Sequence, residues 1–192
     1  RMDRMAGEID RFRPATLEAN PAMLARLARH IHSRGPRVRP PGVIVFTYEA
    51  PSRLHRRQIA RVFDCPMASS YGSTEAGYVF MECERGRLHQ NAEFCHVDFV
   101  PLKPEHGGPR TGRIFVTTFA NSWFRVLRFN IGDLVRLADG PCPCGRRDGL
   151  TLEAIEGRAR DLTRTADGRA VTLDRLDAAL ADVQGLAAYR VE

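Results

Sequence analysis

The chain has 192 residues, of which 43% are hydrophobic, enough for one sizeable core or for one core and part of a second. Its net charge of +6 comes almost entirely from arginine, because Lys103 is the only lysine. The arginines are dispersed among acidic and apolar residues, without the aromatic interleaving of a nucleic-acid-binding face. We therefore expect no nucleic-acid partner.

The chain also lacks the patterns of membrane and secreted proteins. No apolar run reaches 18 residues, and no signal-peptide core follows Arg1, so we expect a soluble, cytoplasmic protein with no membrane partner. Five cysteines, two of them in Cys142-Pro143-Cys144, favour metal binding in a reducing compartment over disulfides. A first residue other than methionine indicates a fragment or a processed chain. The sequence does not determine the oligomeric state, and a homodimer is compatible with it.

Helical and strand patterns alternate in the first 70 residues. Asn20 followed by Pro21 is typical of a helix start, and Ser52 can cap a second helix. The strand, helix, strand order predicts a βαβ unit, whose ligands gather at the carboxyl ends of the strands. The predicted elements are a helix over 15–32 that ends near Gly35, a strand over 43–47, a helix from Ser52 to about Phe63, and a strand over 67–70.

Beyond Gly77 the pattern changes to apolar alternation interrupted by turn residues, which predicts a β-rich subdomain with mixed or antiparallel strands. A polar loop rich in proline, glycine and cysteine covers 140–149. Asp167-Gly168 marks the turn of a hairpin beyond the loop. The predicted elements are strands over 79–82, 94–100, 113–119 and 124–137, a hairpin of 161–165 with 170–173, a helix over 173–183, and a strand over 187–191.

These patterns together predict an α/β fold. A βαβ unit is joined to the β-rich subdomain and is followed by the start of a small α+β C-terminal domain. We expect 1–157 to form a partial N-terminal core, and 158–192 to form a linker and the beginning of the C-terminal domain.

Residues 69–77, with the sequence SSYGSTEAG, are the first candidate site. Glycines let backbone amides approach a ligand closely, hydroxyl groups can bind phosphate oxygens, and the carboxylate of Glu75 can hold a divalent cation. This mixture suits a nucleotide phosphate with its Mg²⁺, and the alternative is a polar turn after a strand. The candidate residues are Ser70, Tyr71, Gly72, Ser73, Thr74 and Glu75.

The run from Tyr71 to Glu75 resembles a signature of the adenylate-forming superfamily, which activates carboxylic acids with ATP. Glu49 and Ala50 stand where these enzymes place an acidic turn beside adenine. Residues 129–134, FNIGDL, resemble the segment whose aspartate holds the ribose hydroxyls, so the resemblance gives Asp133 that role.

A fourth segment, residues 156–161, resembles the Gly-Arg-x-Asp-Asp linker of the superfamily. The resemblance places Arg158 near ribose or phosphate and Arg160 at the pivot between domains, where the family normally has an acid or a lysine. Taken singly, Asp133 is also compatible with a turn aspartate and Arg158 with a solvated arginine. The order of four motifs along nearly the whole chain favours the enzymatic interpretation.

The second candidate site combines thiols and an imidazole. Three sulfurs and one nitrogen make a closed tetrahedral set of the structural zinc type, which leaves no open position for substrate. We therefore predict a zinc ion that joins two loops, the alternative being free loop cysteines. Cys65 and Cys95 are predicted to be buried, and His96 is a weak substitute ligand. The four predicted ligands are Cys83, His89, Cys142 and Cys144.

The resemblance implies an ATP-dependent acid–CoA ligase, and the Cys-Pro-Cys-Gly-Arg segment also occurs in a phenylacetate-CoA ligase-like branch. Such a ligase uses ATP with Mg²⁺ to convert a carboxylic acid to an acyl-adenylate, and CoA then displaces AMP. The family's phosphate loop and its C-terminal lysine are absent from these residues. We therefore expect that the chain alone is inactive and that a longer chain or a partner subunit supplies the missing segments. Two alternatives remain open, namely an adenylate-forming enzyme with another acceptor and a non-catalytic, zinc-stabilised binding module.

Overall fold

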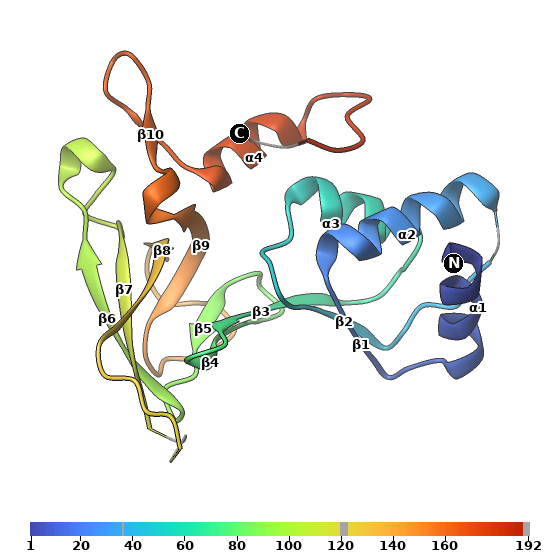
Figure 1. Cartoon of the computed structure of the whole chain (residues 1–192), viewed down its shortest axis with the longest axis horizontal. Coiled ribbons are helices and arrows are strands. Elements are labelled where there is room, and N and C mark those ends of the chain that lie inside the picture. Colours follow the sequence, from blue (N-terminus) through green and yellow to red (C-terminus); the bar gives the residue numbers. More distant parts are fainter. Residues whose placement is uncertain (36, 120–122, 190–192) are drawn as a thin grey trace. The chain divides into compact units, whose positions relative to one another are not determined.

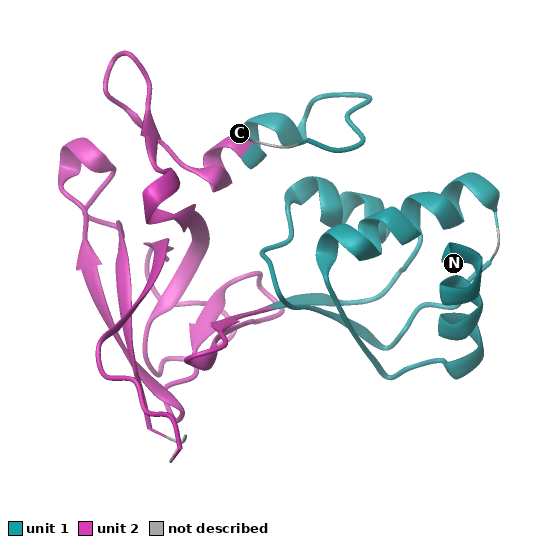
Figure 2. Ribbon diagram, in the orientation of Figure 1, with its two compact units in different colours: residues 1–69, 177–192 teal, residues 70–176 magenta. Residues whose placement is uncertain are grey.

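The structure is a computed structural model that describes residues 1–35, 37–119 and 123–189. Contacts divide the chain into two compact units, Arg1–Ser69 with Asp177–Glu192 and Ser70–Leu176 (Figure 2). One boundary falls within a strand and the other within a helix. Neither coincides with the domain boundary expected at 158, which stays a prediction.

The first unit is built on three parallel strands, with α2 and α3 as crossover helices on one side of them (Figure 1). The third strand, β3, pairs with β2 through Met67 to Ser69 and then continues into the second unit. The N-terminal helix α1 packs on α2. The elements are α1 (Met2–Phe12), β1 (Thr16–Ala19), α2 (Pro21–Arg34), β2 (Val43–Phe46), α3 (Arg53–Ala60) and β3 (Met67–Ser73).

Capping residues fix the ends of both crossover helices. The Asn20 side chain accepts a hydrogen bond from the Met23 amide, and Gly35 ends α2 in the left-handed conformation at φ 73°. Ser52 caps α3 in a capping box with His55. The predicted capping roles of Asn20 and Ser52 therefore correspond to real hydrogen bonds.

An apolar core lies between the helices and the strands of this unit. The α2 residues recur at helical spacing and meet aromatic and aliphatic side chains of β2 and α3, so that each burial contributes roughly 1.5–3 kcal/mol. The buried set includes Leu24, Leu27, Ile31, Ile44, Phe46, Ile59 and Phe63.

Three expectations for the first unit need correction. The predicted helix over 15–32 is wrong at its start, because residues 16–19 form β1 and the helix begins only at Pro21. The second helix ends at Ala60 rather than near Phe63. No strand covers 187–189, and the rest of that predicted strand lies outside the described residues. The helix α1 was not predicted.

The second unit is dominated by an antiparallel sheet in the order β3-β4-β5-β9-β8-β7-β6. A two-stranded hairpin and the first turn of α4 follow the sheet along the chain. The elements are β4 (Gly77–Glu82), β5 (Leu88–Gln90), β6 (Cys95–Pro101), the 3-10 helix η1 (Pro104–His106), β7 (Thr111–Thr118), β8 (Phe129–Leu137), β9 (Thr151–Arg158), the 3-10 helix η2 (Ala159–Asp161), β10 (Thr163–Arg164), β11 (Ala170–Val171) and α4 (Leu173–Ala181).

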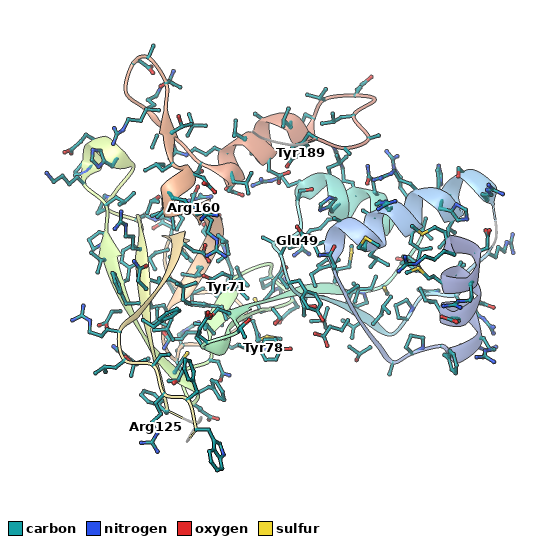
Figure 3. All side chains as sticks on the ribbon, viewed as in Figure 1. Glu49, Tyr71, Tyr78, Arg125, Arg160 and Tyr189 are labelled. Atoms are coloured by element: carbon teal, nitrogen blue, oxygen red, sulfur yellow. The ribbon has the colours of Figure 1, made fainter. Side chains whose placement is uncertain are left out.

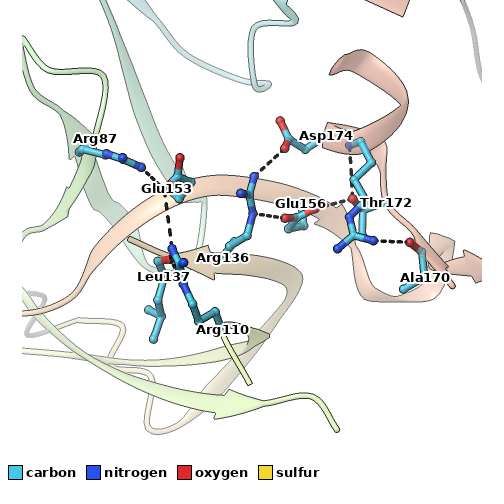
Figure 4. A network of polar contacts seen from close by, with 10 residues as sticks. Arg87, Arg110, Arg136, Leu137, Glu153, Glu156, Ala170, Thr172 and Asp174 are labelled. Atoms are coloured by element: carbon cyan, nitrogen blue, oxygen red, sulfur yellow. Dashed lines mark hydrogen bonds and ion pairs between the residues drawn. The ribbon is translucent and has the colours of Figure 1, made fainter. Parts of the chain in front are cut away.

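A polar clasp fastens the start of α4 to this sheet (Figure 4). The carboxylate of Glu156 is 1% exposed and accepts hydrogen bonds from Arg136 at 2.6 Å and from the Thr172 hydroxyl. Arg136 also forms an ion pair with Asp174 at 2.9 Å. We call these four side chains the Glu156 clasp. It joins the residues just before η2 to the residues just after β11.

The predicted fold class is confirmed, since parallel βαβ connections are followed by an antiparallel, β-rich part. The predicted hairpin forms as β10 and β11, and α4 lies within two residues of its predicted range. Residues 124–128 are not in a strand, contrary to the prediction, and β5 and β9 were not predicted. Within the described residues, no helix is both long and apolar enough to cross a membrane.

Candidate functional site

The SSYGSTEAG segment forms a tight hairpin in which β3 ends, residues 74–76 turn, and β4 begins. Gly77 has φ 67°, and the Ser73 hydroxyl accepts a hydrogen bond from the Ala76 amide at 3.1 Å across the turn. Gly72 has no space for a side chain, because a Cβ there would lie 1.8 Å from the Gly77 carbonyl oxygen. Gly72 is thus required by the close approach of the two strands, and Gly77 by its left-handed conformation.

Tyr71 connects this hairpin to the second predicted motif. Its hydroxyl donates a 2.6 Å hydrogen bond to Asp133, a buried residue of β8 (Figure 3 labels Tyr71). The other carboxylate oxygen of Asp133 lies 3.2 Å from Nε of Arg158, which is its register partner on β9. Arg158 also donates to the Ile131 carbonyl oxygen at 2.9 Å. Three predicted site residues from three strands therefore meet at one carboxylate.

The Tyr71 hydroxyl keeps its proton and donates it in the hydrogen bond to Asp133. Burial, and then the negative charge of Asp133 and their hydrogen bond, raise the pKa of Tyr71 far above its ordinary value. The phenol therefore stays protonated at physiological pH and presents its proton to Asp133. Asp133 is therefore held between the neutral hydroxyl of Tyr71 and the cationic guanidinium of Arg158.

The turn of the hairpin leaves its polar side chains accessible. Thr74 and Glu75 are exposed, and no side chain within 1–35, 37–119 and 123–189 forms an ion pair with Glu75. The hydroxyl oxygen of Ser70 is buried and has no hydrogen-bond partner among the described residues. Such a buried, unsatisfied hydroxyl is uncommon and indicates a position where a ligand or water completes the hydrogen bonding.

The other predicted site residues, Glu49, Ala50 and Arg160, are all exposed. Glu49 and Ala50 are exposed just after β2 in the first unit, where the Glu49 carboxylate accepts a 2.6 Å hydrogen bond from the Asn20 side chain. The predicted pivot, Arg160, lies in η2 and is exposed, with an ion pair to the adjacent Asp161 at 3.6 Å. Figure 3 labels both Glu49 and Arg160.

The four predicted zinc ligands come together in the second unit. One ligand atom from each of Cys83, His89, Cys142 and Cys144 lies within 4.8 Å of all the others. We call these residues the Cys₃His cluster. The Sγ atoms of Cys83 and Cys142 are 3.8 Å apart, and Cys144 Sγ is 3.3 Å from His89 Nε2. These separations are those of ligands around one tetrahedral ion.

The surroundings of the Cys₃His cluster suit a metal site. The Thr151 hydroxyl lies 3.2 Å from Nδ1 of His89, which leaves Nε2 facing the sulfurs. Burial, and then the positive charge of Arg146, hold the pKa of His89 below its ordinary value, which favours the neutral imidazole that binds metals. The set therefore has the composition and the ligand spacing of a structural metal centre.

One contributor to these sites was not predicted, and two predicted residues make contacts that were not expected. Thr151 orients His89 only because β5 pairs with β9, with His89 opposite Thr151 in the register. Tyr71 was expected to face a nucleotide, whereas it also holds Asp133. Glu156 was part of the predicted linker motif, although nothing in its sequence context indicated a buried carboxylate.

Solved structures of acyl-CoA and acid ligases share this fold over part of their length. 2-Hydroxyisobutyryl-CoA ligase in complex with 2-HIB-AMP matches with a TM-score of 0.77 at 18% identity, over 96% of this chain and 41% of that one. A mutant form of coronafacic acid ligase from Pectobacterium brasiliense matches with a TM-score of 0.67 at 16% identity, over 97% and 38%. A benzoate CoA ligase from Burkholderia xenovorans LB400 matches with a TM-score of 0.55 at 16% identity, over 83% and 34%. The predicted resemblance is thus confirmed at the level of the fold.

Comparison with curated sequences gives a relative whose name differs from those of the ligases above. The chain is 25% identical over 178 residues to Protein CapK of Staphylococcus aureus, which covers 92% of this chain and 38% of CapK. No protein-family profile matches the sequence. The chain therefore spans about two fifths of the length of the proteins that it resembles.

Proposed function

We propose that this chain is the nucleotide-binding portion of an AMP-forming acid–CoA ligase of the phenylacetate-CoA ligase kind. The observation that carries the proposal is the hydrogen bond from Tyr71, in the signature hairpin, to Asp133, the residue assigned to the ribose by resemblance. Two motifs that are 62 positions apart in sequence meet at one carboxylate.

The residues present fit ATP and Mg²⁺. Asp133 would accept hydrogen bonds from the ribose hydroxyls, Arg158 would lie near ribose or phosphate, and the unsatisfied Ser70 hydroxyl would bind the ligand. Glu75 would hold Mg²⁺, which commonly takes one or two protein carboxylates and completes its shell with water and phosphate oxygens. The bound cation would neutralise charge at the phosphates while the substrate carboxylate attacks the α-phosphate and pyrophosphate leaves. Glu49 and Ala50 would bind adenine, and Arg160 would act as the pivot.

The Cys₃His cluster would hold a structural Zn²⁺. Its four side chains leave no position for a substrate, so the ion would stabilise loops rather than take part in the reaction.

Elemental analysis of the purified chain should find about one zinc per chain. A protein carrying both Cys142→Ser and Cys144→Ser should contain no zinc and melt at a lower temperature. A matched Cys65→Ser variant should keep both, because Cys65 lies outside the cluster. If the double variant kept the metal and the melting temperature, the zinc proposal would be wrong.

AMP titration of the chain tests the nucleotide site. We expect Asp133→Asn to weaken AMP binding by roughly ten- to a hundredfold, because charged hydrogen bonds to the ribose are lost. Asp139→Asn is the matched control, since Asp139 is an exposed residue of the same unit. Circular dichroism would verify that Asp133→Asn still folds. The absence of any AMP or ATP binding to the wild-type chain would instead favour a non-catalytic, zinc-stabilised module.

Catalysis needs a separate test on the longer protein, because we propose that this portion alone does not turn over. With a carboxylic acid and ATP, the longer protein should release pyrophosphate, and Glu75→Ala should abolish the release. Wild-type activity of Glu75→Ala would count against the assignment. Replacing CoA by other acceptors in the same assay distinguishes a CoA ligase from an adenylate-forming enzyme with another acceptor.

A further inference from the structure

An arginine-lined hollow of about 450 Å³ lies in the second unit, apart from the residues assigned to the nucleotide. Its wall is formed by η1, by the hairpin of β10 and β11, and by the start of α4. Three guanidinium groups line it, from Arg164, Arg169 and Arg175. We call this the arginine hollow. Its volume is in the range of pockets that bind small ligands.

The charges of the arginine hollow are not balanced by its own acids. Asp167 is engaged by Arg169 at 2.7 Å and by the Thr165 hydroxyl. Arg164 and Arg175 form no ion pair with any carboxylate of the described residues. Glu105 contributes one further acid to the lining, but Arg164 contacts its backbone oxygen rather than its carboxylate. Arg164 and Arg175 therefore line the hollow without an ion pair to any carboxylate of the described residues.

Backbone contacts hold these two arginines in place. Arg164 Nη1 donates to the carbonyl oxygens of Glu105 and Gly168, at 3.2 Å each. Arg175 Nη1 donates to the Ala170 carbonyl oxygen at 2.7 Å. A guanidinium has five N–H groups, so each side chain is oriented by one nitrogen and keeps further donors for a ligand. Binding would then cost little additional side-chain entropy.

We propose that the arginine hollow is a binding site for a phosphate-bearing ligand. The planar fork of a guanidinium matches two oxygens of one phosphate, and two forks from different elements can hold both phosphates of a diphosphate. The site does not depend on the proposed ligase activity. Its ligand is either free inorganic phosphate or pyrophosphate, or the phosphate end of a larger molecule.

Titration of the whole chain with pyrophosphate at low ionic strength tests the site. We expect Arg164→Gln and Arg175→Gln each to weaken pyrophosphate binding by about tenfold, as the loss of one charged contact predicts. Arg113→Gln is the matched control, because Arg113 is an exposed arginine on β7 of the same unit. Unchanged affinity in the two hollow variants, or an equal loss in the control, would overturn the proposal.

A second measurement uses the wild-type chain and does not depend on how the variants fold. Phenylglyoxal modifies accessible arginines, and mass spectrometry locates the modified positions. Pyrophosphate should protect Arg164 and Arg175 and leave Arg113 unprotected. Modification of Arg164 and Arg175 at the same rate with and without pyrophosphate would refute the site.

The two sources of phosphate are then distinguished by competition. If CoA displaces pyrophosphate and protects the same arginines more strongly than inorganic phosphate does, the ligand is the phosphate end of a larger molecule. If only the inorganic anions protect, the site is for free phosphate or pyrophosphate. Arg164→Gln should leave the affinity for AMP unchanged. The proposed nucleotide site at Asp133 and the arginine hollow are therefore tested by different measurements, AMP binding for the first and pyrophosphate binding for the second.

Discussion

Removal of Arg136 from the Glu156 clasp should destabilise the second unit strongly. The variant Arg136→Met keeps much of the side-chain volume but removes the cation that compensates Glu156, which is only 1% exposed. Breaking a buried ion pair by removing one partner typically costs 3–5 kcal/mol, because a charge is left buried without a partner. Arg136 itself is 31% exposed, so water can reach part of the site. We therefore expect the lower end of that range, about 3 kcal/mol.

A double-mutant cycle separates the cost of the uncompensated charge from the cost of lost packing. Glu156→Gln alone should cost about 1–2 kcal/mol, since the amide keeps some of the hydrogen bonding to Arg136 and Thr172. In the combined variant the buried charge is gone. Its destabilisation should therefore lie below the sum of the single effects, by at least about 1 kcal/mol. Strict additivity would refute the reasoning that Arg136 serves to compensate Glu156.

The assay has to report on the second unit. Two compact units need not unfold together, and the single tryptophan, Trp123, is 98% exposed and would report folding poorly. Amide hydrogen exchange of β8 and β9 during a urea titration resolves the unit directly. Arg128→Met is the matched control, because Arg128 forms an exposed ion pair with Asp98 at 3.5 Å in the same unit. That pair should contribute at most about 1 kcal/mol.

Three further predictions concern other parts of the chain. Gly72→Ala should destabilise the signature hairpin by at least about 3 kcal/mol in urea unfolding, because the new Cβ would lie 1.8 Å from a backbone oxygen; Gly7→Ala, in open space on α1, should instead stabilise the chain slightly. Folding raises the pKa of Tyr71 above its ordinary value of 10.0, so the folded state holds the phenolic proton more tightly than the unfolded state does. The stability that this proton contributes is present below pH 10.0 and is lost as the pH rises above that value. Tyr71 should therefore contribute no phenolate absorbance up to about pH 11, so that the absorbance of the folded wild type and of Tyr71→Phe should rise equally up to that pH. A higher absorbance of the wild type below that pH would contradict the burial of Tyr71. Hydrogen bonds and the charge of Arg39 lower the pKa of Asp10 from 3.8 to about 2, so this contact stabilises α1 above pH 3.8 and is lost as pH falls through about 2. Hydrogen exchange of α1 should speed up over that window in the wild type, whereas Asp10→Asn should show no such step.

Local patterns predicted α2, β2 and α3 of the first unit, because these two helices have clear caps. Asn20 and Ser52 cap α2 and α3 in the structure as their positions in the sequence indicate. The strand β1 was assigned to a helix because Leu17 fits the apolar period of the helix that follows. Four residues are too few to separate a strand from a helix by periodicity, and only the pairing with β2 decides the matter.

The second unit depends on pairings between distant segments, and these were harder to predict. The strand β5 has three residues, and β9 carries Glu153, Glu156 and Gly157, so neither shows a clean alternation. Their pairing nevertheless sets His89 opposite Thr151. The ligand set was predicted because ligand chemistry is visible in residue types, whereas the orientation of His89 was not, because it follows from tertiary pairing.

The Cys₃His cluster and the Asp133 site are connected through the same strands, which gives the proposed zinc a role without contact to any nucleotide. β4 begins at the signature hairpin and ends next to Cys83, while β8 and β9 pair Asp133 with Arg158 at one end and enclose the loop of Cys142 and Cys144 at the other. A shift of one residue in the register of a strand would reverse the direction of its side chains. An ion that joins these loops would therefore fix the pairing that presents Tyr71 and Arg158 to Asp133. It follows that removal of zinc should weaken AMP binding as well as thermal stability, although no zinc ligand is assigned to the nucleotide.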